Sequence, residues 1–282
     1  MYKRQVLEAV DYNLKDTVLS YIPNTASVAF RGLVDGVFGF CDKVRKDKIQ
    51  QLGRSPDPKL IEEILSIKPR VEHVAVKDVK LRTFITQDSQ RDDLVTHVYD
   101  ISYGSIRKDV DSLVVIDDSI VRGTTLKHSI IRILDRLGPR TIIIASSAPQ
   151  IRYPDCYGID MTKISDFIAF RATIELIKDT KQENIINEVY RKCKEQENLP
   201  KEEIVNHVKG IYAPFTAGDI SEKISEMLTT PGITAKIQII YQTIENLHAS
   251  IPNHTGDWYF TGNYPTPGGN KVVNRSFINY IE

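Results

Sequence analysis

The sequence predicts an α/β protein with an open parallel sheet and flanking helices, followed by a mainly helical C-terminal region. Two continuous apolar runs, SLVVID at residues 112–117 and TIIIASSAP at residues 141–149, are typical of central strands covered on both faces. Between them lies a helical apolar stripe that ends at a Gly-Pro pair and consists of Leu126, Ile130, Ile133, Leu134 and Leu137. A strand, a helix and a strand joined by short links predict parallel pairing with a right-handed crossover.

The N-terminal part supplies the remaining strands of this sheet. Residues 18–24 (VLSYIPN) predict a buried strand, and residues 25–40 predict a helix with Thr25 near its cap. Residues 42–70 form a charged, poorly periodic segment. Residues 71–76 (VEHVAV) predict a second strand, and residues 81–87 (LRTFITQ) predict a third. Residues 88–111 lack a sustained period, which indicates either a functional flap or a disordered link.

Beyond residue 162 the apolar residues recur at helical spacing. Three stripes carry this pattern: Ile185, Ile186, Val189, Tyr190 and Cys193; Ile204, Val205, Val208 and Ile211; and Ile220, Ile224, Met227 and Leu228. Residues 233–247 fit a strand or a helix. We therefore expect a core at residues 1–162 and a mainly helical extension, packed on the core, at residues 163–282.

Composition and charge limit the classes of partner. A chain of 282 residues with 41% hydrophobic residues can fill one large core or two smaller ones. Lys plus Arg and Asp plus Glu are both 37, so no net field favours nucleic acid or an anionic membrane. The three cysteines are scattered, which indicates a reducing compartment and no structural metal site. With neither a signal peptide nor an apolar stretch of about 18 residues, we expect a cytoplasmic protein.

The stretch VVIDDSIVRGTT, which begins at Val114, joins the first central strand to the helix after it. Ligands of open parallel sheets bind at this end of the strands. The backbone N–H groups of residues 121–125 are expected at the N-terminus of the helix, where unpaired donors and the helix dipole favour an anion. Gly123 allows close approach, and Thr124 and Thr125 add hydroxyl donors. This half of the stretch predicts a phosphate site.

The two acids of this stretch, Asp117 and Asp118, need a separate explanation, because carboxylates repel phosphate at short range. Carboxylates accept hydrogen bonds from sugar hydroxyls and bind Mg²⁺ directly or through water. A ribose between a phosphate and a magnesium-bound polyphosphate therefore satisfies both halves. Helix capping alone is the simpler explanation for any one of these residues, but not for the ordered string.

IDDSIVRGTT resembles the phosphoribosyl pyrophosphate (PRPP) loop of type I phosphoribosyltransferases. The longer pattern is similar to the glutamine PRPP amidophosphoribosyltransferase family, because three further stretches occur in matching order and spacing. These stretches are IPNTASVAFRGLVDG from Ile22, RTFITQDSQ from Arg82 and SSAPQIRYPDCYGID from Ser146. The similarity covers residues 18–160, with a weaker echo in YFTGNYP from Tyr259. It implies a type I phosphoribosyltransferase-like open sheet.

The resemblance implies a role for the residues of these stretches. The catalytic residues would be Arg82, Asp117 and Asp118. The two aspartates would bind the ribose hydroxyls and the associated Mg²⁺, with a hydroxyl from Thr25 nearby, and Arg82 would face the pyrophosphate. The 5′-phosphate would be held by Ser119, Ile120, Val121, Arg122, Gly123, Thr124 and Thr125. Residues 88–104 would form a flexible loop that closes over PRPP and excludes water.

The reaction implied by the resemblance is displacement of pyrophosphate from C1 of PRPP by ammonia, which gives 5-phosphoribosylamine in de novo purine synthesis. The transition state would resemble an oxocarbenium ion. The enzyme would then position ammonia, neutralise the departing pyrophosphate and exclude water. Family members carry an N-terminal glutaminase domain with an initial cysteine, and this chain has no cysteine near Met1. We expect that domain upstream in the full-length protein, which we expect to be a homo-oligomer.

Two further departures from the family pattern concern the closing loop and a cluster. The second half of that loop is usually basic in the family, whereas LVTHVYDISYG at residues 94–104 has only His97. Some members bind an iron-sulfur cluster, but Gly256 and Tyr259 stand where its cysteines would be. Three scattered cysteines cannot form a four-thiolate site, so we expect no iron-sulfur cluster.

Two other functions use the same loop. A salvage phosphoribosyltransferase would attach a base to PRPP, but the stretch at residues 146–160 favours a nucleophile pocket of the amidotransferase kind. A PRPP-sensing protein would keep the phosphate loop without catalysis, which the unusual closing loop favours. A nucleic-acid regulator of that kind would need a basic face, of which the balanced charge gives no sign.

Overall fold

The computed structural model describes residues 3–23, 25–53, 55–77, 99–102, 104–157, 161–254 and 256–282. The chain divides into two compact units. The first comprises residues 1–118, 125–147 and 230–240, and the second comprises residues 119–124, 148–229 and 241–282. The predicted boundary after residue 162 would divide the sequence into two continuous parts. The two observed units each consist of several separate segments. That boundary stays a prediction.

The first unit is built around an open five-stranded parallel sheet. Its strands are β1 (Thr17–Tyr21), β2 (Arg70–Val71), β5 (Ser112–Asp117), β6 (Thr141–Ser146) and β7 (Lys236–Tyr241), in the order β2-β1-β5-β6-β7. β1 pairs in parallel with β2 and with β5, and β5 pairs in parallel with β6. The predicted fold class is confirmed.

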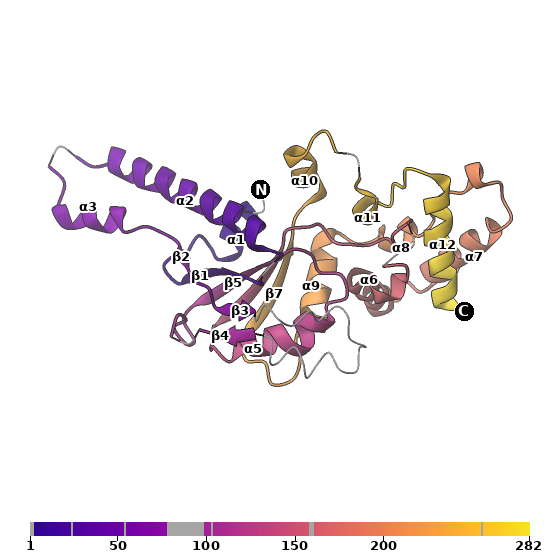
Figure 1. Cartoon of the computed structure of the whole chain (residues 1–282), viewed down its shortest axis with the longest axis horizontal. Helices are drawn as coiled ribbons and strands as arrows, with labels where there is room; N and C mark the ends of the chain where they lie inside the picture. The colour runs from indigo at the N-terminus through magenta and orange to yellow at the C-terminus, as the bar shows by residue number, and fades with distance from the viewer. Residues whose placement is uncertain are drawn as a thin grey trace. The chain divides into compact units, whose positions relative to one another are not determined.

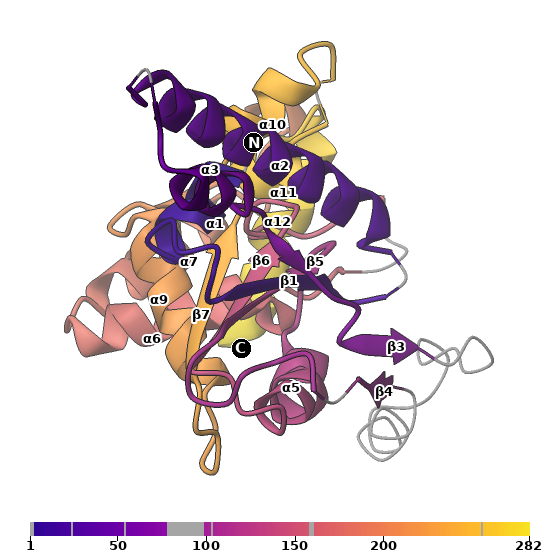
Figure 2. The same ribbon diagram turned by 90° about the vertical axis from the view of Figure 1, so that its left-hand side faces the viewer.

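Helices cover both faces of the central strands, as their continuous apolar sequences predict. Successive residues of β5 point to opposite faces, and Leu113, Val114, Val115 and Ile116 are all buried. The helices α1 (Lys3–Ala9) and α2 (Ser27–Gln50) lie on one face of the sheet. A π-helical turn (Leu126–Ile130) and α5 (Ile131–Asp135) lie on the other face (Figure 2). The five residues of the predicted stripe are all buried, so the helix prediction is confirmed.

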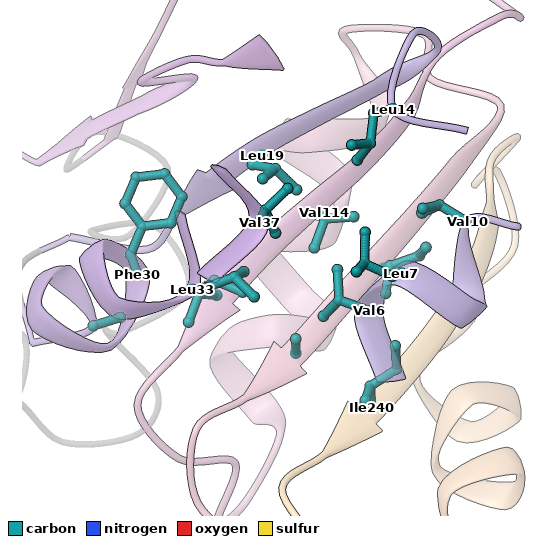
Figure 3. Packing of buried hydrophobic residues seen from close by; sticks show 14 of the residues in the cluster. Val6, Leu7, Val10, Leu14, Leu19, Phe30, Leu33, Val37, Val114 and Ile240 are labelled. Carbon is teal, nitrogen blue, oxygen red and sulfur yellow. The ribbon is translucent and has the colours of Figure 1, made fainter. Parts of the chain in front are cut away.

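The core under α1 and α2 is aliphatic. Figure 3 shows Val6 and Leu7 of α1 and Leu33 and Val37 of α2 directed at the strands, where they pack around Val114. Each fully buried aliphatic side chain stabilises the fold by roughly 1.5–3 kcal/mol relative to exposure.

α2 extends well beyond the predicted helix, and a second helix follows it. The C-terminal half of α2 is mostly exposed after Cys41, so it has no apolar stripe that could predict it. α3 (Pro58–Leu65) lies beside α2 (Figure 1) and begins at Asp57, whose side chain accepts a hydrogen bond from the Lys59 N–H at 2.9 Å. The charged, poorly periodic residues 42–70 therefore contain the end of α2 and the whole of α3.

Residues 71–76 form parts of two strands instead of one. β2 ends at Val71, and β3 (Ala75–Lys77) pairs antiparallel with β4 (Tyr99–Ile101) in a separate two-stranded sheet. The Val74 N–H donates to the Ser20 hydroxyl at 3.2 Å instead of continuing the ladder with β1. The predicted strand at residues 81–87 lies outside the described residues.

The second unit is mainly helical. It contains α6 (Ile168–Asp179), α7 (Asn184–Glu195), α8 (Lys209–Tyr212), α9 (Ala217–Leu228), α10 (Ile244–Ser250), α11 (Trp258–Thr261) and α12 (Pro267–Ile281). Phe170 of α6 packs edge-on against Phe277 of α12, with ring centroids 6.1 Å apart. The stripe from Ile204 to Ile211 is not one helix, since Val205 is 51% exposed and α8 begins only at Lys209.

Residues 233–247, which fit either element in sequence, contain both: β7 and then the start of α10. Thr243 caps α10, because its side chain accepts a hydrogen bond from the Asn246 N–H at 3.1 Å. The helices of the described ranges are all too short or too polar to span a lipid bilayer.

Candidate functional site

The chain order of the sheet reverses between β1 and β5. From β1 the chain continues to β2 on one side, while β5, β6 and β7 follow on the other. Tyr21 and Ile116 are paired in register, so the segments after these strands leave the sheet at the same edge. In open parallel sheets, ligands bind at such a reversal, outside the carboxyl ends of the strands. Asp117 and Asp118 lie at this place in the first unit.

The backbone of the acid pair is fixed by the end of β6. The Ser147 N–H donates to the Asp117 carbonyl at 2.9 Å, and the Ser147 hydroxyl donates to the Asp118 carbonyl at 3.0 Å. Within the pair, the Asp118 N–H donates to Oδ1 of Asp117 at 2.9 Å. Both side chains are half-buried. The two carboxylates are therefore held on a rigid strand end.

The electrostatics of this pair favour a cation or hydroxyl donors. Burial, followed by the neighbouring charge of Asp118, raises the pKa of Asp117 to about 8, although the Asp118 N–H acts in the opposite direction. A bound cation or a ribose hydroxyl would stabilise the ionised form of Asp117. The pair therefore suits a ligand that brings positive charge and hydroxyl groups together.

The structure describes only some of the residues that were predicted to lie near the metal and the pyrophosphate. Thr25 is exposed and follows β1, one residue before Ala26, which caps α2 without a side-chain hydrogen bond. Arg82 lies outside the described residues, as does most of the predicted closing loop at residues 88–104. Their roles stay predictions.

Residues 119–124 belong to the second unit, where they contact the start of α6. The Val121 carbonyl accepts a hydrogen bond from the Ile168 N–H at 2.8 Å, and the Arg122 carbonyl accepts one from Nη2 of Arg171. The side chain of Arg122 pairs with Asp166 at 3.2 Å. The predicted contribution of Arg122 to phosphate binding would therefore come from its backbone N–H.

Gly123 is required by its conformation and by its surroundings. Its φ of +72° lies in the left-handed region, and a Cβ at this position would lie 2.4 Å from Cδ1 of Ile168. The chain is helical from Thr124, and both Thr124 and Thr125 are exposed. The left-handed residue thus directs the chain from the loop into the helix.

Three residues that hold this stretch were missed by sequence reasoning. Ser147, Asp166 and Arg171 bind the backbone or side chains of the acid pair and the loop, and Arg171 lies 49 residues from its partner Arg122. No local pattern marks Arg171, because α6 looks like an ordinary amphipathic helix in sequence.

The acid pair is not a complete metal cage. In the part of the chain that is described, no group of three or more His, Cys, Asp or Glu side chains could hold a metal ion. Mg²⁺ in phosphate-handling proteins is usually bound by one or two carboxylates and completed by water and substrate phosphates. The donor set of Asp117 and Asp118 fits this shared form of binding.

Comparison with known proteins shows sequence similarity to one group of enzymes. An amidophosphoribosyltransferase of Haemophilus influenzae is 41% identical over 68 residues, which are 24% of this chain and 13% of that protein. Those of Escherichia coli and Saccharomyces cerevisiae are 40% and 42% identical over 67 residues, again 24% of this chain and 13% of each protein. The matched stretch thus spans about 13% of the length of these relatives. No protein-family model matches the chain.

Two solved structures show a weaker likeness. A glutamine PRPP amidotransferase from B. subtilis, complexed with ADP and GMP, is 20% identical with a TM-score of 0.44, covering 89% of this chain and 38% of that one. A structure described as the allosteric regulatory enzyme of purine biosynthesis is 19% identical with a TM-score of 0.41, covering 89% and 37%. Over about a quarter of its length, this chain is similar in sequence to amidophosphoribosyltransferases.

Proposed function

We propose that this chain is the synthase part of an amidophosphoribosyltransferase, which displaces pyrophosphate from PRPP with ammonia. One observation carries the proposal: β5, at the reversal of the parallel sheet, ends in two half-buried aspartates that are followed by the Arg-Gly-Thr-Thr loop. The sequence similarity to amidophosphoribosyltransferases supports this assignment.

The substrate is bound along one continuous stretch of chain. The carboxylates of Asp117 and Asp118 accept hydrogen bonds from the ribose hydroxyls. The N–H groups of residues 119–125 and the hydroxyls of Thr124 and Thr125 bind the 5′-phosphate, which the following helix dipole also attracts. Because these groups are consecutive, one ligand with a ribose next to a phosphate satisfies both.

Magnesium is the metal that fits these donors. Asp117 and Asp118 would hold Mg²⁺ together with the ribose hydroxyls and pyrophosphate, with the hydroxyl of Thr25 nearby. When bound, Mg²⁺ neutralises the charge that develops on the departing pyrophosphate. Arg82 is proposed to act on the same pyrophosphate.

The chemical step requires little acid–base help from the protein. The C1–O bond to pyrophosphate breaks and its electron pair leaves with the oxygen, while the ammonia lone pair forms the new C1–N bond. The nitrogen then loses one proton to solvent, which gives 5-phosphoribosylamine. The protein orients ribose and ammonia and excludes water, which would otherwise compete for C1.

The similarity to amidophosphoribosyltransferases also supports proposals about the ammonia source, the assembly and the location of the protein. We propose that a glutaminase domain supplies the ammonia in the full-length protein, and that the protein is a cytoplasmic homo-oligomer without nucleic acid or membrane partners. We also propose that it carries no iron-sulfur cluster.

The purified chain should be incubated with PRPP, Mg²⁺ and ammonia, and pyrophosphate release should be measured. Parallel reactions should replace ammonia with adenine, guanine or uracil. Pyrophosphate release in the presence of ammonia, but not of any of the three bases, supports the proposal. Release only with a base would instead identify a salvage enzyme, and PRPP binding without turnover in the full-length protein would identify a sensor.

A further inference from the structure

Two successive carbonyl groups of the loop are held by the start of α6. The Val121 carbonyl accepts from the Ile168 N–H at 2.8 Å, and the Arg122 carbonyl accepts from the guanidinium of Arg171. In a trans peptide the C=O and the N–H point in opposite directions. The N–H groups of Arg122 and Gly123, which share these peptide units, therefore point away from α6.

The guanidinium that holds the Arg122 carbonyl has one unfavourable feature, an unpaired buried N–H. Arg171 is half-buried, and among the described residues its Nε–H is buried without a hydrogen-bond partner. A buried donor without a partner is unfavourable. Arg171 therefore keeps its hydrogen bond to the Arg122 carbonyl although its own Nε–H is left without a partner.

Three side chains on the α6 side of the loop, Arg122, Asp166 and Arg171, carry more positive than negative charge. Asp166 pairs with Arg122 at 3.2 Å and is also the carboxylate that acts on Arg171. Two guanidinium groups therefore share one carboxylate, which gives these three residues a net charge of +1. A phosphate beside the N–H groups of the loop would be attracted by that charge.

We propose that Arg171 is a positioning residue for the 5′-phosphate: it holds the Arg122 carbonyl so that the N–H groups of Arg122 and Gly123 face the ligand. This inference rests on the proposed function. Without the guanidinium, the peptide between Arg122 and Gly123 is free to turn, and its carbonyl would then repel the phosphate. Gly123 makes that turn easy, because glycine adopts many backbone conformations.

The inference predicts which ligands depend on Arg171. Ribose 5-phosphate and PRPP share the 5′-phosphate, whereas magnesium pyrophosphate lacks it. We expect Arg171→Ala to weaken binding of ribose 5-phosphate and PRPP by about 10- to 100-fold, the effect of losing one charge-assisted hydrogen bond. Binding of magnesium pyrophosphate should not change. Arg171→Lys keeps the charge and one donor, so its affinities should lie between those of the wild type and the alanine variant.

The control variant is Lys178→Ala on the same helix, because Lys178 is an exposed cation that pairs with Glu175. Isothermal titration with the three ligands should be combined with hydrogen exchange of the backbone amides at residues 121–125. Arg171→Ala should accelerate that exchange, and Lys178→Ala should change neither exchange nor binding.

Each outcome decides the inference. Equal weakening for all three ligands would show a general loss of structure and would overturn it, as would unchanged affinity for ribose 5-phosphate. If the wild-type chain binds none of the ligands, the proposed function is wrong. In that case the exchange measurement alone decides whether Arg171 holds the loop.

Discussion

Gly123 combines a left-handed backbone with close packing against Ile168. Replacement by alanine adds a Cβ that would displace the terminal methyl group of Ile168, and it forces a conformation that alanine rarely adopts. We expect Gly123→Ala to lower the free energy of unfolding by about 1–3 kcal/mol and to weaken PRPP binding. Denaturant unfolding monitored by circular dichroism measures the first effect, and titration with PRPP measures the second.

A matched glycine lies on α2. Gly39 is in the middle of that helix, and a Cβ there would meet nothing within 4 Å. Gly39→Ala is expected to raise the free energy of unfolding by about 0.5–1 kcal/mol, since glycine destabilises a helix interior relative to alanine. Equal stability changes for the two variants would contradict the assignment of Gly123 as a required left-handed residue.

At the residue scale, the sequence predicts the proposed ligand-binding groups better than the groups that support them. Asp117, Asp118 and Gly123 could be predicted because their types and spacing are local and unusual at the end of an apolar strand. Ser147 and Arg171 could not be predicted, because only the folded chain brings them to the backbone of that stretch. The raised pKa of Asp117 also depends on burial, which the sequence does not specify.

At the element scale, the amino end of β5 is anchored by a buried carboxylate. Asp111, whose side chain is 0% exposed, accepts hydrogen bonds from Nη1 of Arg70 at 2.7 Å and from Nη2 of Arg107 at 2.6 Å. Burial alone would raise the pKa of Asp111, but the hydrogen bonds from Arg70 and Arg107 outweigh burial and lower it to about 2. This anchor ties the segment before β5 to β2.

The lowered pKa gives a defined pH dependence. Because the pKa of Asp111 is lower in the folded chain than the ordinary value of 3.8, its stabilising effect is complete above that value and is lost as the pH falls toward 2. Asp111→Asn should destabilise the protein by about 2–3 kcal/mol at neutral pH, because Arg70 loses its carboxylate partner and Arg107 keeps only its ion pair with Asp16. It should also flatten the fall in stability between these pH values.

Urea unfolding of the wild type and of Asp111→Asn, measured at several pH values between 6 and 2, tests this. Asp35→Asn on α2 is the control, because Asp35 is exposed. The anchor would be disproved by parallel stability curves for the wild type and Asp111→Asn across the acidic range.

Elements with an apolar stripe could be predicted, and elements without one could not. β5, β6 and the helix between them match the predictions because burial on both faces gives continuous or periodic apolar sequences. The C-terminal half of α2 is exposed to solvent, so its sequence has no apolar stripe. The split of residues 71–76 between β2 and β3 depends on a hydrogen bond to Ser20, which is distant in sequence.

At the scale of the whole molecule, the cysteines bear on which nitrogen source the proposed reaction would use. Burial raises the pKa of Cys41 and raises that of Cys193 to about 12, while burial and then the charge of Asp155 raise the pKa of Cys156. All three thiols therefore stay protonated near neutral pH. A glutaminase needs a reactive thiolate.

We accordingly expect the 282-residue chain to use ammonia and not glutamine. The test is to measure glutamate and pyrophosphate release with each nitrogen source in the presence of PRPP and Mg²⁺. With ammonia, the rate should rise with pH, because only the unprotonated form has the lone pair that attacks C1. Glutamate release by this chain would refute the prediction.

The fold class of the whole molecule could be predicted from the sequence, but its division into two units could not. The PRPP-loop-like stretch, continuous in sequence, is divided between them: Asp117 and Asp118 belong to the first unit, and residues 119–124 belong to the second. Sequence patterns indicate the order of the helices and strands along the chain. The compact units depend instead on which distant segments pack together.

The proposed function depends on binding of the ribose of PRPP by the paired aspartates. The most direct measurement is isothermal titration of PRPP with excess Mg²⁺ into the wild type and into the double variant Asp117→Asn and Asp118→Asn, with Asp35→Asn as the control. We predict at least about a 100-fold loss of affinity in the double variant, from two lost charge-assisted contacts, and no change in the control. Equal affinity of the double variant and the wild type would show that the aspartates do not bind the ribose.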